Sequence, residues 1–152
     1  EEPVKIALGA DHAGLATKKA LSEELKKLGH EVTSFGADDG TPVDYPDPAR
    51  EVAESVAKGS AERGILVCGT GMGVSIAANK VHGIRAALVH DEYTTIMSRA
   101  HNDANVLCLG GRTMDAQKAV GLVGLWLKTK FEGGRHQHRL DKISRIEKED
   151  AK

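Results

Sequence analysis

Short apolar runs alternate along this chain with segments whose apolar residues recur at helical spacing. The first run is "VKIALGA" (Val4–Ala10), and the segment after it places Leu21, Leu25 and Leu28 on one helical face before Gly29. Glycine after the last apolar position of such a face commonly ends a helix. The pattern therefore predicts a strand followed by a helix at the start of the chain.

The strand-then-helix unit is repeated four more times. The repeats pair "EVTSF" with "DPAREVAESVAKG", "RGILVCG" with "SIAANK", "IRAALVH" with "DEYTTIMSRAHN", and "NVLCLGG" with "MDAQKAVGLVGLWLK". The runs "GILVC" and "VLCL" are apolar throughout, which is typical of strands covered on both faces. The alternation predicts an α/β fold in which a parallel sheet carries helices on both faces.

The last segment, "RHQHRLDKISRIEKEDAK", has Leu140, Ile143 and Ile146 on one stripe. This spacing predicts a C-terminal helix from about residue 136 that packs on its own domain or on another subunit. At 152 residues the chain has the length of one ordinary domain, so we expect a single domain over residues 1–152.

Composition excludes several classes of function. The chain has 21 Lys and Arg against 22 Asp and Glu, so nothing attracts it generally to nucleic acid or to an anionic membrane surface. No apolar run approaches the roughly 20 residues of a membrane span. The two cysteines, Cys68 and Cys108, form no C-x-x-C pair, so we expect neither a disulfide framework nor a cysteine zinc site. A reducing cytoplasm is the expected compartment.

Candidate chemistry is sought where strands end, because ligands of parallel α/β sheets bind beyond the carboxyl ends of the strands. The residues in that position are Asp11 and His12, the segment from Tyr45 to Asp47, Cys68 with its loop, His90 and Asp91, and Gly110 to Arg112.

The loop "CGTGMG" carries Gly69, Gly71 and Gly73 between a strand and a helix. Exposed backbone N–H groups at a helix start suit an anion. The loop lacks the G-K-[ST] ending of a Walker loop, and its G-x-G-x-G spacing differs from the dinucleotide fingerprint. Asp91 nevertheless lies near the offset of a ribose-binding acid, which leaves open a small nicotinamide-dependent oxidoreductase.

Cys68 has two interpretations. Cysteine is most often a small buried hydrophobe, but a thiol at a helix start ionises more readily and can act as nucleophile or base. A base beside a hole lined by N–H donors suits removal of a proton alpha to a carbonyl. Cys108, inside the apolar run "NVLCLGG", is expected in the core.

Three further motifs are ambiguous when taken alone. "ADH" can be a helix cap, and "SRAHNDANV" can be an ordinary helix end. Arg135 and Arg139 are four residues apart on one helix face and could clamp a phosphate. His136 and His138 could be a metal pair, but no carboxylate and third histidine are visibly arranged around them, so no metal site is expected.

Together these motifs resemble the ribose-5-phosphate isomerase type B family, which also includes galactose-6-phosphate isomerase subunits. The resemblance spans nearly the whole chain, in order, through "ADHAG", "VDYPD", "CGTGMGVSIAANK", "GIRAAL", "SRAHNDANVL", "GGR" and "FEGGRHQHR". It implies a three-layer α/β/α sandwich with a five-stranded, Rossmann-like sheet of strand order 2-1-3-5-4. It also implies no metal or organic cofactor, and a homodimer whose active sites are shared between subunits.

The resemblance also implies roles for individual residues. Cys68 would be the base that moves a proton between C2 and C1, and Thr70 would exchange protons between O1 and O2. His101 would open the furanose ring with help from Asp11. The anion hole would be formed by the rest of the loop: Gly69, Gly71, Met72, Gly73 and Val74. One branch of the family has a glutamate base at the position of Val74, so Cys68 places this chain in the thiol branch.

The remaining implied residues bind the substrate. His12, Arg135 and Arg139 would hold its phosphate with support from Arg112, while Tyr45 and Asn102 would line the sugar site. Five residues are expected from the partner subunit: His101, Asn102, Arg112, Arg135 and Arg139.

The expected activity is the interconversion of ribose 5-phosphate and ribulose 5-phosphate through an enediolate, a step of the pentose phosphate pathway. Isomerisation of a six-carbon sugar phosphate, such as allose 6-phosphate or galactose 6-phosphate, is an alternative, because pocket size cannot be read from the sequence. A non-catalytic sugar-phosphate sensor is a further alternative, which the combination of Cys68, His101 and Asp11 disfavours. Pairing of dimers into tetramers is left open.

Overall fold

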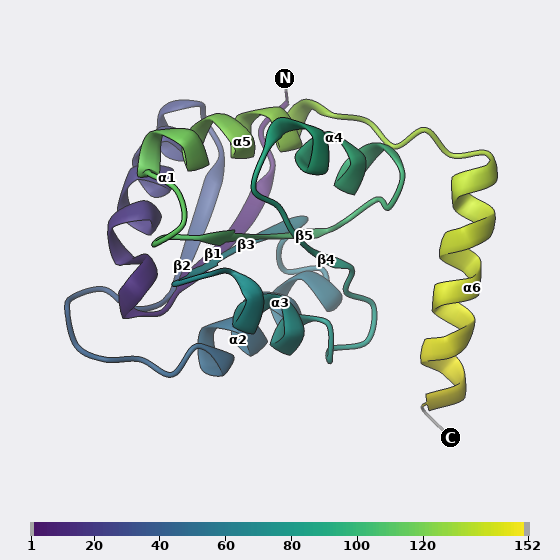
Figure 1. Cartoon of the computed structure of the whole chain (residues 1–152), viewed down its shortest axis with the longest axis horizontal. Coiled ribbons are helices and arrows are strands. Elements are labelled where there is room, and N and C mark those ends of the chain that lie inside the picture. Colours follow the sequence, from purple (N-terminus) through teal and green to yellow (C-terminus); the bar gives the residue numbers. More distant parts are fainter. Residues whose placement is uncertain (1, 151–152) are drawn as a thin grey trace.

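A five-stranded parallel sheet forms the centre of the computed structural model, which describes residues 2–150 (Figure 1). Its strands are β1 (Lys5–Ala10), β2 (Glu31–Gly36), β3 (Arg63–Cys68), β4 (Ala86–Leu88) and β5 (Val106–Gly110). They lie in the order β2-β1-β3-β5-β4, and every neighbouring pair is parallel. The predicted α/β class and strand order are confirmed.

Helices cover both faces of the sheet. The helical segments of the chain are the 3-10 turn η1 (His12–Gly14), α1 (Leu15–Lys27), α2 (Pro46–Ala57), α3 (Met72–Ala78), α4 (Glu92–Ala100), α5 (Ala116–Lys128) and α6 (Arg135–Asp150), of which α6 covers neither face. In Figure 1, α1, α4 and α5 lie on one side of the sheet, and α2 and α3 lie on the other. The predicted three-layer sandwich is therefore present.

Alternating side chains of the strands feed two hydrophobic cores. On β1, Ile6 and Leu8 belong to the core under α1 and α5, whereas Ala7 belongs to the core under α2 and α3. Trp126 of α5 is completely buried in the first core. Because both faces are covered, β5 is buried along its whole length and β3 along all but its first residue, as their continuous apolar runs predicted.

The β4 edge of the sheet is closed in an unusual way. The run "IRAALVH" predicted a longer strand, but only Ala86–Leu88 pair with β5. Before them, the backbone N–H of Arg85 donates to the Asn105 side chain at 2.8 Å. The side-chain amide of Asn79 donates to the carbonyl of Ala86 at 3.0 Å and accepts from its N–H at 2.8 Å. Asn79 thus takes the place of a further strand at this residue.

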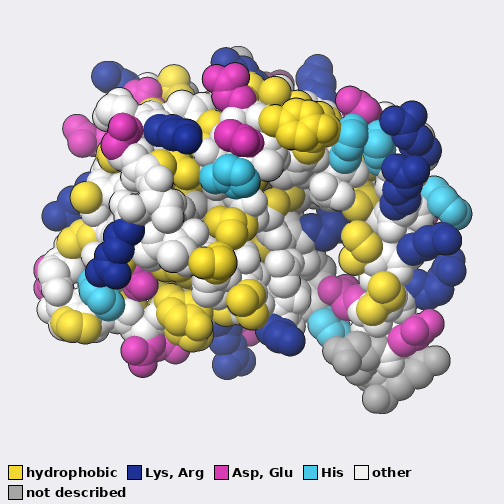
Figure 2. Space-filling model, in the orientation of Figure 1, with side chains coloured by type: hydrophobic (Ala, Val, Ile, Leu, Met, Phe, Trp, Pro, Cys, Tyr) yellow, Lys and Arg dark blue, Asp and Glu magenta, His cyan; other side chains and the backbone are white. Residues whose placement is uncertain are grey.

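Helix α6 stands beside the sandwich at its β4 edge (Figure 1). Of its predicted apolar stripe, Leu140 is buried, but Ile143 and Ile146 are 47% and 67% exposed. These two isoleucines line a cleft between α6 and the body, part of which is visible in Figure 2. No helix within residues 2–150 is long and apolar enough to cross a membrane.

Candidate active site

The carboxyl ends of β1, β3 and β5 meet at one edge of the sheet. Ala10 is in register with Val67, and Cys68 is in register with Gly110. Beyond the ladder, the N–H of Asp11 donates to the carbonyl of Val67 at 3.2 Å, and the N–H of Gly111 donates to the carbonyl of Cys68 at 2.8 Å. Cys68 therefore lies between the Asp11 turn and the Gly111 turn, as the strand order requires.

The Cys68 thiol faces the start of α3. Its Sγ atom accepts a hydrogen bond from the backbone N–H of Gly71 at 3.2 Å, and the residue is 4% exposed. Gly71 has φ +80°, and a Cβ there would lie 2.6 Å from Leu88 and 2.9 Å from the carbonyl carbon of Leu109. The loop needs glycine at this position both for its conformation and for its close approach to β5. This contact holds the sulfur at the mouth of the loop, beside the other backbone N–H groups of the turn.

Thr70 and Val74 of the glycine loop make contacts within the chain. Thr70 is exposed, and its hydroxyl oxygen accepts from the backbone N–H of Met72 at 3.2 Å. Val74 is completely buried in the core under α2 and α3. Its side chain faces this core, so the predicted contribution of Val74 to the anion hole would come from its backbone N–H.

Asp11 and His12 are held in place by backbone contacts. Asp11 Oδ1 accepts from the N–H groups of Ala13 and Gly14 at 2.9 and 3.2 Å, so the predicted cap function is confirmed. His12 Nδ1 accepts from the N–H of Val43 at 3.1 Å. When the imidazole is neutral, this contact places its proton on Nε2, which becomes a donor for a ligand.

Tyr45 reaches the loop from the segment before α2. A Cβ on Gly73 would lie 2.6 Å from the Tyr45 ring, so the ring rests directly on the backbone of the glycine loop. Tyr45 is also partly exposed. A ring in this position can border a small ligand bound at the loop.

Arg112 belongs to the same edge of the same chain. Its N–H donates to the carbonyl of Gly69 at 2.9 Å, and a Cβ on Gly69 would lie 3.6 Å from both Cδ and Nη1 of Arg112. The expectation that Arg112 reaches the loop from a partner subunit is therefore corrected: the chain's own Arg112 borders it. The turn after β5 produces this placement because β5 is the direct neighbour of β3.

The other predicted residues lie elsewhere. His101 ends α4, and Asn102 follows it in the turn that leads to the start of β5. That turn adjoins the start of β3, since the N–H of Gly64 donates to the carbonyl of Asn105 at 2.9 Å. At about 3.3 Å per residue, the four steps from Gly64 to Cys68 separate the two edges by roughly 13 Å. Arg135 and Arg139 lie on α6, outside the sandwich (Figure 1).

His101 instead meets two residues near the start of α6. Its ring stacks on His136 with centroids 4.0 Å apart and planes 15° from parallel. Glu132 Oε1 lies 3.8 Å from His101 Nε2 and 3.3 Å from His136 Nε2. Burial lowers the pKa of His136, and the charges of His101 and Arg135 lower it further. Glu132 was missed by sequence reasoning, and no motif links it to a histidine 31 residues away.

The oxidoreductase alternative loses support, and the expected core position of Cys108 is confirmed. Asp91 Oδ1 accepts from both the backbone N–H and the hydroxyl of Thr94 at 2.7 Å, so it caps α4, a role that competes with binding a ribose. Cys108 is completely buried, and burial raises the pKa of its thiol, as expected for a core cysteine.

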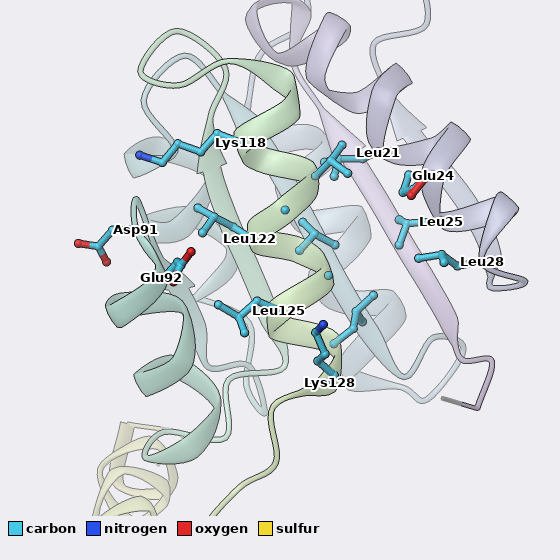
Figure 3. Close-up of a pocket in the computed structure, with 15 residues that line it drawn as sticks. Leu21, Glu24, Leu25, Leu28, Asp91, Glu92, Lys118, Leu122, Leu125 and Lys128 are labelled. Carbon is cyan, nitrogen blue, oxygen red and sulfur yellow. The ribbon is translucent and has the colours of Figure 1, made fainter.

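The molecule also has a large groove whose lining does not include Cys68 or the glycine loop. It has a volume of about 690 Å³ between α1 and α5, with Leu21, Leu25 and Leu122 in its lining (Figure 3). Of the candidate residues named above, only Asp91, which caps α4, is in its lining. The groove therefore does not compete with the Cys68 edge as the candidate active site.

Comparison with known proteins identifies the family of the chain. The ribose/galactose isomerase family model matches residues 6–143. A Clostridium thermocellum ribose-5-phosphate isomerase B structure is 51% identical, with TM-score 0.94, covering 95% of this chain and 98% of that one. The Mycoplasma genitalium ribose-5-phosphate isomerase B structure with bound ribulose-5-phosphate is 49% identical, with TM-score 0.90 and coverage of 95% and 97%. Escherichia coli (strain K12) ribose-5-phosphate isomerase B is 46% identical over 94% of this chain and 96% of its own. The chain belongs to the ribose/galactose isomerase family.

Proposed function

We propose that this chain is an aldose-ketose isomerase that interconverts ribose 5-phosphate and ribulose 5-phosphate. The observation that carries the proposal is the position of Cys68, whose sulfur faces the N–H of Gly71 between the Asp11 and Arg112 turns. Family membership and the ribulose-5-phosphate complex of the Mycoplasma genitalium relative support the same substrate class.

The reaction needs a base that reaches two adjacent carbons of an open-chain sugar. In the aldose-to-ketose direction, the Cys68 thiolate takes the proton from C2, and the C2–H electron pair forms the double bond of an enediolate. The same sulfur then returns the proton to C1, while the Thr70 hydroxyl moves a proton between O1 and O2. Electrons and protons balance within the sugar, so the reaction needs no external oxidant.

The negative charge of the enediolate requires donors that are in place beforehand. Backbone N–H groups of the loop from Gly69 to Val74 can supply them, because the close packing of Gly71 against β5 fixes the loop. Asp11, oriented by its two backbone donors, can hold a sugar hydroxyl. His12 and Arg112 flank the loop and can bind the phosphate, and Tyr45 borders the sugar.

A second copy of the chain would complete the site with His101 for ring opening, Asn102 for the sugar, and Arg135 and Arg139 for the phosphate. Two observations support this arrangement: these residues are far from Cys68 within one chain, and Ile143 and Ile146 of α6 are exposed. We therefore propose a homodimer with shared sites, each chain acting as one isomerase domain. The two free cysteines suit a reducing cytoplasm.

A coupled isomerase assay tests the proposal. Ribose 5-phosphate, allose 6-phosphate and galactose 6-phosphate are compared in EDTA without added metal, with Cys68→Ser protein prepared in parallel to control for contaminating isomerases. We expect the highest kcat/KM for ribose 5-phosphate. A preference for either six-carbon sugar would contradict the substrate assignment, and inactivity on all three would contradict the function.

Isotope transfer tests the chemistry separately. With deuterium at C2 of the aldose phosphate, removal of the proton by Cys68 slows turnover and releases part of the label to solvent. Complete transfer of the deuterium to C1, together with near-normal activity of Cys68→Ser, would indicate a hydride shift and contradict the enediolate route.

A further inference from the structure

His101, Glu132 and His136 form a compact group of metal-ligating side chains. One ligand atom from each residue lies within 4.8 Å of the other two. The two imidazoles approach the same carboxylate oxygen, Glu132 Oε1, through their Nε2 atoms at 3.8 and 3.3 Å. The group brings together the end of α4, the connection between α5 and α6, and the first turn of α6.

Backbone contacts hold the three residues together. The N–H of Glu132 donates to the carbonyl of Ala100 at 3.0 Å, which ties the connection to the end of α4. The N–H of His136 then donates to the carbonyl of Gly133 at 3.1 Å, so the chain turns back between Glu132 and His136. The His136 side chain is almost fully buried, whereas those of His101 and Glu132 are 36% and 56% exposed. One ligand is thus fixed, and the other two can adjust.

We propose that His101, Glu132 and His136 bind a divalent transition-metal ion of the zinc class. Zinc takes imidazole nitrogen and carboxylate oxygen at about 2.0–2.2 Å, which places the ligand atoms of a tetrahedral site roughly 3.4 Å apart. The distances from Glu132 Oε1 to the two Nε2 atoms are close to this value. A rotation of the exposed His101 ring out of its stacked position brings its lone pair onto the ion.

The composition of the group limits what it binds. Two imidazoles and one carboxylate favour zinc, copper, nickel or iron over calcium and magnesium, which prefer oxygen ligands. Three protein ligands leave a fourth position open to water, unlike the closed four-ligand sites that stabilise folds. Arg135 and Arg139 carry positive charge close to His136 and oppose a cation. The site is therefore expected to bind reversibly rather than to hold a permanent structural metal.

The ion would act against the isomerase reaction. Coordination through Nε2 removes that nitrogen of His101 from proton transfer, and His101 is the residue proposed above for ring opening. Metal binding is inferred from the geometry of the three side chains alone, whereas its inhibitory effect also rests on the proposed function. The two parts are therefore tested by different measurements.

The first measurement is calorimetric titration of zinc into metal-free protein. It is made on Cys68→Ser protein, so that zinc cannot bind the active-site thiol. Glu132→Gln and His136→Gln are compared in that background with His138→Gln, an exposed histidine on the same helix that is not in the group. We expect one ion per chain, unaffected by His138→Gln and weakened at least about tenfold by either of the other substitutions. Equal binding by all variants, or no saturable binding, would overturn the site.

The second measurement is inhibition of the Cys68-containing enzyme by zinc, reversed by EDTA. Each variant is compared with its own zinc-free rate. We expect His136→Gln to require at least about tenfold more zinc than His138→Gln for half inhibition. Where the titration finds the site but zinc leaves the rate unchanged, metal binding stands and the ring-opening role of His101 is wrong. Equal inhibition of both variants would assign the inhibition to Cys68 and overturn the regulatory part.

Discussion

The sulfur of Cys68 accepts a hydrogen bond from the backbone N–H of Gly71 at 3.2 Å, across the mouth of the glycine loop. This contact places a potential base beside the backbone donors that an enediolate needs. A cysteine that served only to pack the core would not require such a donor. Replacing the sulfur is therefore the most direct test of the site.

Cys68→Ser is expected to fold and bind substrate but to lose turnover. The serine hydroxyl fits the loop mouth and can accept the Gly71 N–H, yet it is a far weaker base than a thiolate near neutral pH. We expect kcat to fall by roughly 10²–10⁴ or more, with little change in KM. Steady-state kinetics and thermal unfolding measure the two effects. Near-normal turnover with reduced stability would identify Cys68 as a packing residue.

Arg135→Ala and Arg139→Ala are expected to weaken substrate binding. Arginines that hold a phosphate contribute to the ground state and the transition state alike, so KM rises more than kcat falls. Loss of one charge-assisted contact should raise KM on the order of 10–100-fold. Inorganic phosphate should compete with substrate in the parent enzyme and compete less in both variants. Arg145→Ala, further along α6, is the matched control; unchanged phosphate inhibition in all three variants would place the clamp elsewhere.

Mixed variants test whether two chains build each site. In a dimer of one Cys68→Ser chain and one His101→Gln chain, one of the two sites contains both intact residues. Random exchange makes about half of the dimers mixed, so the activity of the mixture should return to roughly a quarter of the parent level. Cys68→Ser mixed with Asp11→Asn is the matched control. Cys68 and Asp11 lie at one edge of one chain, so every site in that mixture keeps a defect. Recovery in both mixtures, or in neither after proven subunit exchange, would contradict the proposed sharing.

Gly71→Ala and Gly73→Ala test two different reasons for glycine in the loop. At Gly71 the reason is the positive φ, and at Gly73 it is the close contact with the Tyr45 ring. At Gly71, alanine meets both a positive φ and the backbone of Leu109, so we expect about 1–3 kcal/mol of destabilisation and loss of turnover. At Gly73 the obstacle is the Tyr45 side chain, which can swing away. Gly73→Ala should therefore keep its stability and change mainly KM. Chemical denaturation with kinetics measures both; equal loss of stability would mean that the Tyr45 ring cannot move.

Lys18→Met tests whether the Lys18 ammonium stabilises the segment that leads to Tyr45. Lys18 is buried and donates to the carbonyls of Phe35 and Ala37 at 2.8 and 2.7 Å, where β2 ends and the segment leading to Tyr45 begins. Burial lowers the pKa of Lys18, and nearby Asp38 partly opposes this. Leaving these carbonyls without the ammonium should cost about 1–3 kcal/mol.

The exposed neighbour Lys19→Met serves as the control for that substitution. It should leave the free energy of unfolding nearly unchanged, since surface substitutions usually do. Equal stability of the two variants in urea denaturation would show that the Lys18 contacts contribute nothing net.

The sheet was predictable because its strands carry their own signals. Apolar runs such as "GILVC" and "VLCL" require cover on both faces, and the turn residues after them expose chemistry at one edge. The length of β4 was not predictable, because Arg85 is held by Asn105, a residue 20 positions away. Periodicity describes which face a residue prefers and does not report such distant side-chain contacts.

The candidate site was predictable in part for the same reason. Asp11, Cys68 and the glycine loop follow neighbouring strands, so the topology alone brings them together. The group of His101, Glu132 and His136 depends on how a connection without regular structure turns, which no local pattern encodes. Arg112 was assigned to the wrong subunit because the family resemblance carries residue types and roles more reliably than it carries the path of a turn.

The Asn79 amide bonded to Ala86 has a consequence for how copies of this chain can associate. An open strand edge offers unpaired backbone groups, and a second chain could extend the sheet there into a continuous ladder. β4 is only three residues long, and Asn79 already occupies both outward groups of Ala86. Sheet-to-sheet polymerisation is thereby disfavoured at this edge, whereas the exposed isoleucines of α6 offer a side-chain surface for the dimer proposed above.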